Sequence, residues 1–229
     1  MATQKIRQSE LLKQVILRIL VAIPVLMLVL FLPAGTWNYW EAWAYLAILL
    51  IPMIFVFLYL FKNNPDLLER RMRMREKETQ QKGIVGLSIV YFLLVFMLPG
   101  LDHRFGWSHV STAVVIGAQV LVLLGYGIVF LVFRENRYAA RVVEVDEQQT
   151  VINTGPYALV RHPMYSGVVI MYVFSPLALG SWWAVLPALL IVPLLVARLR
   201  NEESVLLRDL PGYGAYMQQV KYRLLPGVW

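Results

Sequence analysis

Two short stretches of the chain carry side chains whose types and spacing can do chemistry. The first, NTGPYALVRHPMYSG at 153–167, combines a Gly-Pro turn, two tyrosine hydroxyls and an Arg-His pair. The second, ARLRNEES at 197–204, places Arg198 and Glu202 four residues apart, hence on one face of a helix. A guanidinium, a carboxylate, an imidazole and phenols around one ligand can recognise a molecule that carries both an anionic and a cationic group.

The local sequence around the first stretch predicts a turn followed by a helix start. Gly155 supplies unusual φ values and Pro156 holds φ near −65°, which is typical of a turn. Pro163 suits the first turn of a helix, where its missing N–H costs nothing. The free N–H groups of that turn favour an anion beside Arg161 and His162. The preceding residues 134–152 end in an alternating run that is typical of an extended strand or loop.

The composition argues against a metal site and against thiol chemistry. The chain has no cysteine, which excludes disulfides, thiolate metal ligands and a cysteine nucleophile. Its three histidines, His103, His109 and His162, are too scattered for a histidine metal cluster. We therefore expect chemistry without a metal.

The elements that must position these residues are membrane helices. Hydrophobic residues make up 59% of the 229 residues and charged residues only 15%, against about a quarter charged in soluble domains. The sequence predicts an all-α polytopic membrane protein with about six transmembrane or partly re-entrant helices and a cytoplasmic C-terminal ligand site, which the resemblance described below makes a cofactor site. The apolar runs are Ile19–Leu32, Ala42–Phe61, Ile84–Leu98, Thr112–Phe133, Ser166–Leu179 and Trp182–Ala197. The last two are short and interrupted by proline, so we expect a tilted or partly re-entrant hairpin there.

The distribution of positive charge predicts the topology. All of the 21 Lys and Arg residues except Arg104 lie in the terminal segments, in 62–82 or in 134–161. The positive-inside rule then puts both termini and the site in the cytoplasm. Tryptophans such as Trp37, Trp107 and Trp182 lie where the opposite interface is expected. The formal charge of +7 therefore indicates topology and attraction to anionic lipid, with no nucleic-acid partner.

The chain reads as one structural unit with two parts. Residues 1–133 form the N-terminal membrane helices with a basic cytoplasmic segment at 62–82, in which Asn64-Pro65-Asp66 leads into a short amphipathic helix. Residues 134–229 form the part that carries the chemistry. The predicted spans contain almost no ionisable residues, which argues against a coupled transporter. We expect an integral, multi-pass protein of the bacterial inner membrane, or of an endomembrane in a eukaryote.

Residues 134–229 resemble the isoprenylcysteine carboxyl methyltransferase family. The resemblance lies in TGPYALVRHPMYSG, in RLRNEES about 35 residues later, and in GYGAYMQQVKYRLLPGVW. Phospholipid methyltransferases and bacterial membrane thiol methyltransferases are similar over the same region. The resemblance implies S-adenosylmethionine as the methyl donor and no metal.

The resemblance also implies roles for individual residues. The cofactor-binding residues that it indicates are Gln149, Thr150, Val151, Ile152, Tyr157, His162, Pro163, Met164, Tyr165 and Glu202. The catalytic candidates are Arg198, which matches an arginine associated with the substrate, and Glu203. Transfer from a sulfonium is mainly a matter of positioning and desolvation, and tyrosine faces can stabilise the positive sulfur.

Two questions stay open at this point. The methyl acceptor is a lipophilic or small molecule, bearing a carboxylate, a thiol or a lipid amine. The alternative activity is that of an NADPH-dependent membrane sterol or steroid reductase, a class that shares an HPxY-like block and a tyrosine-rich tail. A non-catalytic lipid-binding scaffold is the third possibility.

Overall fold

The computed structural model describes residues 2–72, 79–139, 145 and 148–229. All regular elements within these ranges are helices, as the predicted all-α fold class requires. In chain order they are α1 (Ala2–Ala34), α2 (Trp40–Asn63), α3 (Pro65–Met72), α4 (Thr79–Phe105), α5 (Thr112–Glu135), the 3₁₀ turn η1 (Gly155–Ala158), α6 (Pro163–Ala178), α7 (Val185–Leu189), α8 (Ile191–Asp209) and α9 (Tyr213–Gln219).

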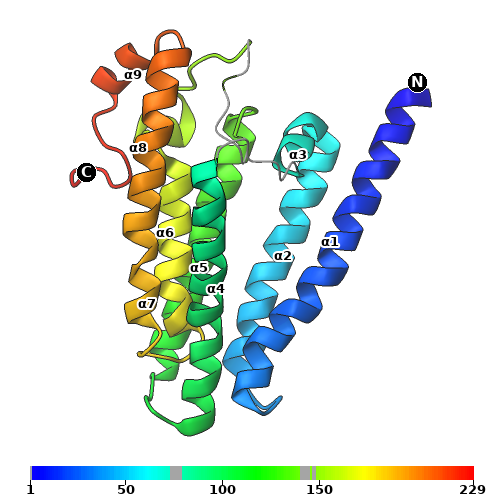
Figure 1. The fold of residues 1–229 in the computed structure, drawn as a ribbon, viewed down its shortest axis with the longest axis vertical. Helices are drawn as coiled ribbons and strands as arrows, with labels where there is room; N and C mark the ends of the chain where they lie inside the picture. The colour runs from blue at the N-terminus through cyan, green and yellow to red at the C-terminus, as the bar shows by residue number, and fades with distance from the viewer. Residues whose placement is uncertain (1, 73–78, 140–144, 146–147) are drawn as a thin grey trace.

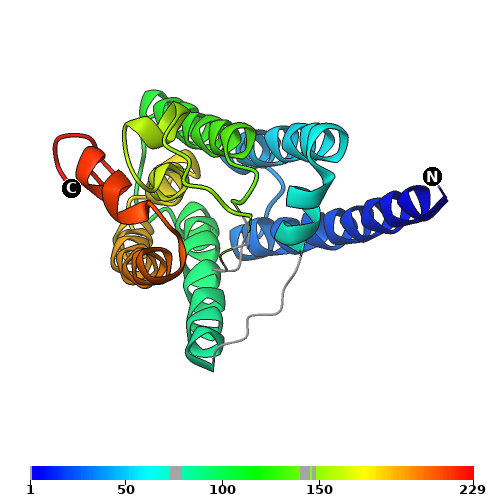
Figure 2. The ribbon, with the colours of Figure 1, turned by 90° about the horizontal axis from the view of Figure 1, so that it is seen from above.

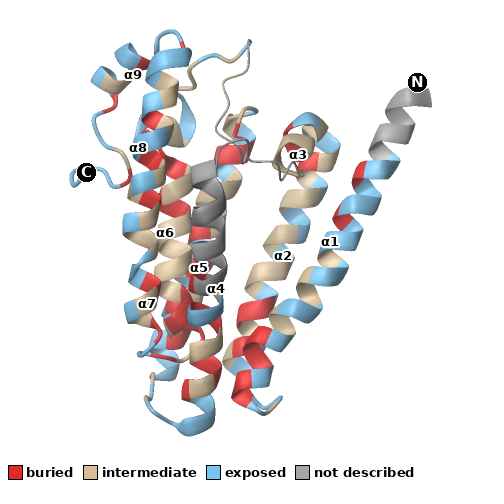
Figure 3. Ribbon diagram, viewed as in Figure 1, coloured by how far each residue is buried: buried red, intermediate tan, exposed pale blue. Residues whose placement is uncertain are grey.

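Helices α4, α5, α6 and α8 form a bundle, and the α1–α2 hairpin meets it at the lower end in Figure 1. Higher up, α1 leans away from the bundle, as the view from above also shows (Figure 2). Buried residues are dense where the hairpin joins the bundle (Figure 3), and Leu30, Ala34, Ala42 and Tyr45 belong to the main hydrophobic core there. The N-terminus, α3 and α9 lie at the upper end.

Three helices are long and apolar enough to cross a membrane among the residues that were described: Ser9–Ala34 in α1, all of α2 and all of α5. Helix α6 is apolar but shorter, with 16 residues. The sixth predicted span is divided, because α7 ends at Leu189 and α8 begins at Ile191. Helix α8 then continues without a break from apolar sequence into the charged residues of 198–209, so one rigid element carries Arg198 and Glu202 to the upper end.

Helices α5 and α6 approach so closely that their glycines touch. A Cβ atom added at Gly125 would lie 2.8 Å from the carbonyl oxygen of Gly167, and one added at Gly167 would lie 2.7 Å from that of Gly125. Only glycine fits such a backbone contact. This packing holds the first residues of α6 beside the end of α5.

A buried carboxylate links two loops at the lower end of the bundle. Asp102, at the end of α4, accepts hydrogen bonds from the Ser108 backbone N–H at 2.7 Å and from the Ser181 hydroxyl at 2.5 Å. It thereby links the loop after α4 to the loop after α6. The exposed tryptophans of this end are Trp37, Trp40, Trp43, Trp107, Trp182 and Trp183, and such a ring of tryptophans is typical of a membrane interface.

The short helix predicted after Asn64-Pro65-Asp66 is α3. Asn64 begins it, since its side-chain oxygen accepts a hydrogen bond from the Leu67 N–H at 3.1 Å. Leu67 and Leu68 pack under it against the end of α5. Residues 73–78 of the basic segment 62–82, and 140–144 and 146–147 of the alternating run, lie outside the described residues. Within the described residues, 148–152 of that run are irregular chain without strand pairing.

Candidate functional site

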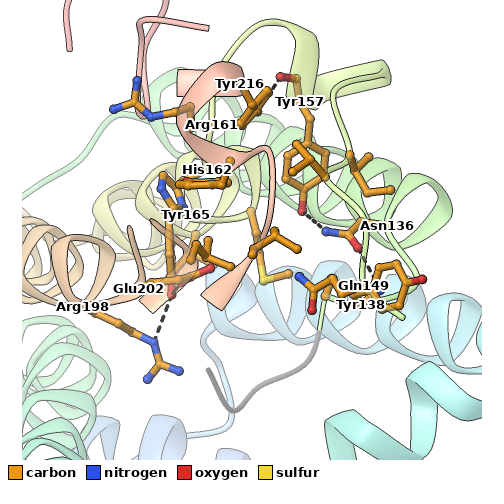
Figure 4. A pocket seen from close by; sticks show the side chains of 18 of the residues that line it. Asn136, Tyr138, Gln149, Tyr157, Arg161, His162, Tyr165, Arg198, Glu202 and Tyr216 are labelled. Carbon is orange, nitrogen blue, oxygen red and sulfur yellow. Dashed lines mark hydrogen bonds between the residues drawn. The ribbon is translucent and has the colours of Figure 1, made fainter. Parts of the chain in front are cut away.

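A cavity of about 420 Å³ lies at the upper end of the bundle. Its walls come from α3, from 136–139 after α5, from 149–152, from η1 and from helices α6, α8 and α9. Figure 4 shows side chains from these separate segments around one space. The volume lies within the range of pockets that hold small molecules and cofactors, roughly 300–1,000 Å³.

The Gly-Pro turn forms one wall of the cavity. Gly155 has φ +55°, a left-handed conformation that favours glycine, and a Cβ there would lie 3.0 Å from the Glu135 carboxylate. The turn presents Tyr157, whose hydroxyl accepts a hydrogen bond from the Asn136 amide at 2.8 Å. The Tyr216 hydroxyl of α9 donates to the Tyr157 carbonyl at 2.8 Å. Hydrogen bonds with Asn136 after α5 and with Tyr216 of α9 therefore both hold the turn in place.

Burial controls the protonation of Tyr157. Burial raises the pKa of its phenol, the Asn136 hydrogen bond lowers it, the Glu202 charge raises it and the Arg71 charge lowers it. The net pKa is about 12. Tyr157 is therefore a neutral phenol at physiological pH, able to offer its face and hydroxyl to a ligand.

The start of α6 is clamped by the C-terminal segment. The backbone N–H groups of Arg161 and His162 donate to the carbonyls of Tyr222 and Arg223, each at 2.9 Å. The Ser166 hydroxyl donates to the Leu224 carbonyl at 2.6 Å. Residues close to the end of the chain thus fix where His162 faces the cavity.

Glu203 also connects the start of α6 with the C-terminal segment. Its carboxylate accepts hydrogen bonds from Arg161 Nε at 2.7 Å and from Arg223 Nε at 2.9 Å, and His162 Nε2 lies 3.3 Å away. Burial would raise the pKa of Glu203, but the hydrogen bonds from His162, Arg223 and Arg161 and the charge of Arg161 outweigh it and lower the pKa to about 2. Glu203 is thus a permanent anion between two cations.

Glu202, its neighbour on α8, turns the other way and lines the cavity. Its carboxylate accepts a hydrogen bond from the Tyr165 hydroxyl at 2.6 Å. Arg198 Nε donates to the same hydroxyl oxygen at 3.1 Å, so Tyr165 links the two charged groups (Figure 4). The antiparallel packing of α6 and α8 therefore brings together RHPMY and RLRNE, as the sequence predicts.

Helix α3 supplies a further cation on another wall. Arg71 donates to the Ala139 carbonyl at 2.9 Å, and its guanidinium lies 4.4 Å from the centre of the Phe133 ring. At the end of the same helix, Arg18 of α1 donates to the Met72 carbonyl at 2.8 Å. Helix α3 thus connects the α1–α2 hairpin to the wall of the cavity.

Most of the residues singled out from sequence surround this one cavity. Those that line it are Gln149, Thr150, Val151, Ile152, Tyr157, His162, Met164, Tyr165, Arg198 and Glu202. Pro163 and Glu203 do not line it. Pro163 is the buried first residue of α6, and Glu203 is engaged in the ion-pair cluster behind the wall.

Several lining residues were not anticipated from sequence as members of a site. They are Arg71, Asn136, Tyr138, Tyr213 and Tyr216. Tyr213 and Tyr216 belong to the stretch GYGAYMQQVKYRLLPGVW, and their spacing of three puts them on one helix face. Arg71 was indistinguishable from its basic neighbours in 62–82. Only the packing of α3 against Phe133 selects it.

A comparison with known families covers much of the chain segment that builds this site. Residues 113–210, from the start of α5 to the end of α8, match the model of the phospholipid methyltransferase family. That family is related to the isoprenylcysteine carboxyl methyltransferases, so the resemblance seen in the sequence is confirmed. No curated protein matches the chain. The part of the chain that builds most of this cavity is therefore similar to the membrane methyltransferases of the phospholipid and isoprenylcysteine type.

Proposed function

We propose that the protein transfers a methyl group from S-adenosylmethionine to a lipophilic or small acceptor that carries a carboxylate, a thiol or a lipid amine. The observation that carries this proposal is the cavity of about 420 Å³ beside α6 and α8. It gathers the segment 149–152, Tyr157, the HPMY block and the Arg198–Glu202 pair, which are far apart in the sequence. The family match over 113–210 supports methyl transfer as the reaction.

The residues of the cavity fit this donor. Glu202 offers a carboxylate to ribose hydroxyls or to the positive sulfur, and Tyr157 and Tyr165 offer π faces to a sulfonium. His162 and the first turn of α6 suit the methionine carboxylate. The Tyr213 hydroxyl is buried and has no hydrogen-bond partner among the described residues, which is expected where a ligand completes the site.

The chain's own contribution to catalysis is positioning. When bound, S-adenosylmethionine supplies an activated methyl group, which leaves sulfur with the S–C electron pair staying behind as the acceptor forms its new bond. Tyr165 orients both Glu202 on the donor side and Arg198 on the acceptor side through its two hydrogen bonds. Holding donor and acceptor in line is the main source of rate in such a transfer.

The acceptor end of the cavity combines charge with apolar surface. Arg198 and Arg71 line it and suit an anionic acceptor or the phosphate of a lipid head. Val168 and Tyr172 of α6 and Leu195 of α8 continue the lining along the apolar parts of their helices. A lipophilic acceptor would lie along these residues with its head between the arginines.

The proposed orientation puts the cavity on the cytoplasmic side, together with both chain termini. In support, the basic residues Arg70, Arg71, Arg134, Arg137 and Arg161 belong to segments of the cavity end, whereas Arg104 follows the apolar part of α4 at the other end. A water-soluble donor would then enter from the cytoplasm and a lipid-like acceptor from the bilayer. We assign Glu203 to holding this architecture and not to the reacting atoms.

The donor site is tested by measuring the affinity for S-adenosylhomocysteine by titration calorimetry in detergent. A hydrogen bond to a charged group contributes about 1.5–3 kcal/mol, so Glu202→Gln should raise the Kd roughly 10- to 100-fold. Glu10→Gln, a change at an exposed carboxylate on α1 that pairs with Lys13, should leave the Kd unchanged. Equal affinity of wild type and Glu202→Gln would remove Glu202 from the donor site.

A further inference from the structure

Two tyrosines of α9 differ in a way that separates structure from ligand binding. Tyr213 and Tyr216 are both 4% exposed and both line the cavity. The Tyr216 hydroxyl donates to the Tyr157 carbonyl at 2.8 Å. The Tyr213 hydroxyl is buried and has no partner anywhere in the described part of the chain. An unsatisfied buried hydroxyl destabilises the folded state, so its retention points to a partner that comes from outside the chain.

The chain turns sharply to put Tyr213 where it is. Helix α8 ends at Asp209, and Gly212 adopts φ +84° to begin α9. A residue with a Cβ is strained at that φ, so glycine is what allows α9 to fold back. The turn packs Tyr213 with Leu210 and Tyr216 in one hydrophobic cluster, against Leu206 of α8 and Val151.

The surroundings of Tyr213 suit a flat, uncharged ring. Val151, Leu206 and Leu210 line the cavity beside it, so apolar side chains approach from the 149–152 segment and from α8. The charges of Glu203 and Glu202 act on the Tyr213 phenol in one direction and the charge of Arg161 acts in the other.

The Tyr213 hydroxyl remains a donor at physiological pH. Burial raises the pKa of this phenol well above its usual range, the charges of Glu203 and Glu202 raise it further, and the charge of Arg161 offsets part of this rise. A neutral phenol can donate its proton to a nitrogen lone pair, such as those on the edge of a purine.

We propose that Tyr213 binds the adenine ring of the methyl donor, donating its hydroxyl to a ring nitrogen while Val151, Leu206 and Leu210 contact the ring. This inference rests on the proposed function, since it assigns one part of the same donor to one part of the same cavity. It makes α9, which lies beyond the matched residues 113–210, a component of the donor site.

The test compares Tyr213→Phe with the matched control Tyr216→Phe. Each change removes one buried hydroxyl, but only Tyr216 loses a hydrogen bond within the protein. Without ligand, Tyr213→Phe should melt at the wild-type temperature or above it, and Tyr216→Phe below it. A neutral hydrogen bond is worth about 1 kcal/mol, so Tyr213→Phe should raise the Kd for S-adenosylhomocysteine about 3- to 10-fold. It should raise the Kd for 5′-methylthioadenosine, which keeps the adenine but lacks the amino acid, by the same factor.

The outcomes separate this inference from the proposed function. If wild type binds S-adenosylhomocysteine and Tyr213→Phe binds it equally well, the adenine contact is refuted and the proposed function stands. Loss of affinity for S-adenosylhomocysteine alone would place the hydroxyl at the amino-acid end and overturn the assignment. A lower melting temperature of unliganded Tyr213→Phe would reveal a partner within the protein, with the same consequence. If wild type binds neither ligand, the proposed function fails and this inference fails with it.

Discussion

Replacing Glu203 by glutamine should destabilise the fold and leave donor binding and methyl transfer nearly unchanged. The change keeps the shape of the side chain but removes the negative charge between Arg161 and Arg223. The Arg161 side chain is only 4% exposed, so water cannot take over the role of the lost carboxylate. Since Arg161 also donates to the Val220 and Lys221 carbonyls, the C-terminal clamp on α6 should loosen with it.

Two arguments give a similar value for the loss of unfolding free energy. The pKa of Glu203 falls from its ordinary 4.5 to about 2 in the folded protein, and a shift of one unit is worth about 1.4 kcal/mol, giving about 3 kcal/mol. Removing one partner of a buried ion pair costs about 3–5 kcal/mol in general. We therefore expect Glu203→Gln to lower the free energy of unfolding by about 3 kcal/mol at neutral pH.

The sign of the pH dependence follows from the direction of the shift. A carboxyl whose pKa is lowered by folding stabilises the protein fully above its unfolded pKa, near 4.5, and loses that contribution as the pH falls toward 2. The unfolding curves of wild type and Glu203→Gln should therefore lie apart at pH 7 and converge in acid.

The assay is chemical unfolding in detergent across this pH range, together with the Kd for S-adenosylhomocysteine at a temperature where both proteins are folded. The Kd should change less than threefold. A variant as stable as wild type at pH 7 would refute the structural role. A fully folded variant that binds the donor normally but transfers no methyl group would return Glu203 to the catalytic residues.

Two further predictions concern packing and the acceptor. Gly125→Ala should destabilise the α5–α6 contact by about 1–3 kcal/mol, whereas Gly127→Ala on the same helix, where an added Cβ meets nothing within 4 Å, should be neutral. Unfolding measurements on both variants check this, and equal stabilities would contradict the close contact with Gly167. Arg198→Ala should lower kcat/KM for an anionic acceptor roughly 10- to 100-fold with an unchanged Kd for S-adenosylhomocysteine. Calorimetry showing a weakened donor would instead move Arg198 to the cofactor side.

Local sequence signals predicted the parts of the structure that local chemistry controls. The apolar runs became helices, Gly155 took the positive φ that its turn needs, and Pro163 took the first turn of α6. The meeting of Tyr165 with Arg198 and Glu202 was also predictable, because the two apolar runs at 166–179 and 182–197 are close in sequence and were expected to form a hairpin.

What the sequence could not predict depends on contacts between distant segments. Glu202 and Glu203 are adjacent on α8, so their side chains point about 100° apart and only one can face the cavity. Which one it is depends on Arg161 and Arg223, and so on where the chain beyond Val220 lies. Arg71 likewise has no distinguishing neighbours in sequence, and its place follows only from the docking of α3.

The measurement that tests the central claim most directly is the thermal stability of the purified protein with S-adenosylhomocysteine and, in parallel, with NADPH. A ligand that binds only the folded state raises the melting temperature by mass action. The account predicts a rise with S-adenosylhomocysteine that is lost in Glu202→Gln, and no change with NADPH. A rise with NADPH alone would contradict it and point to a reductase.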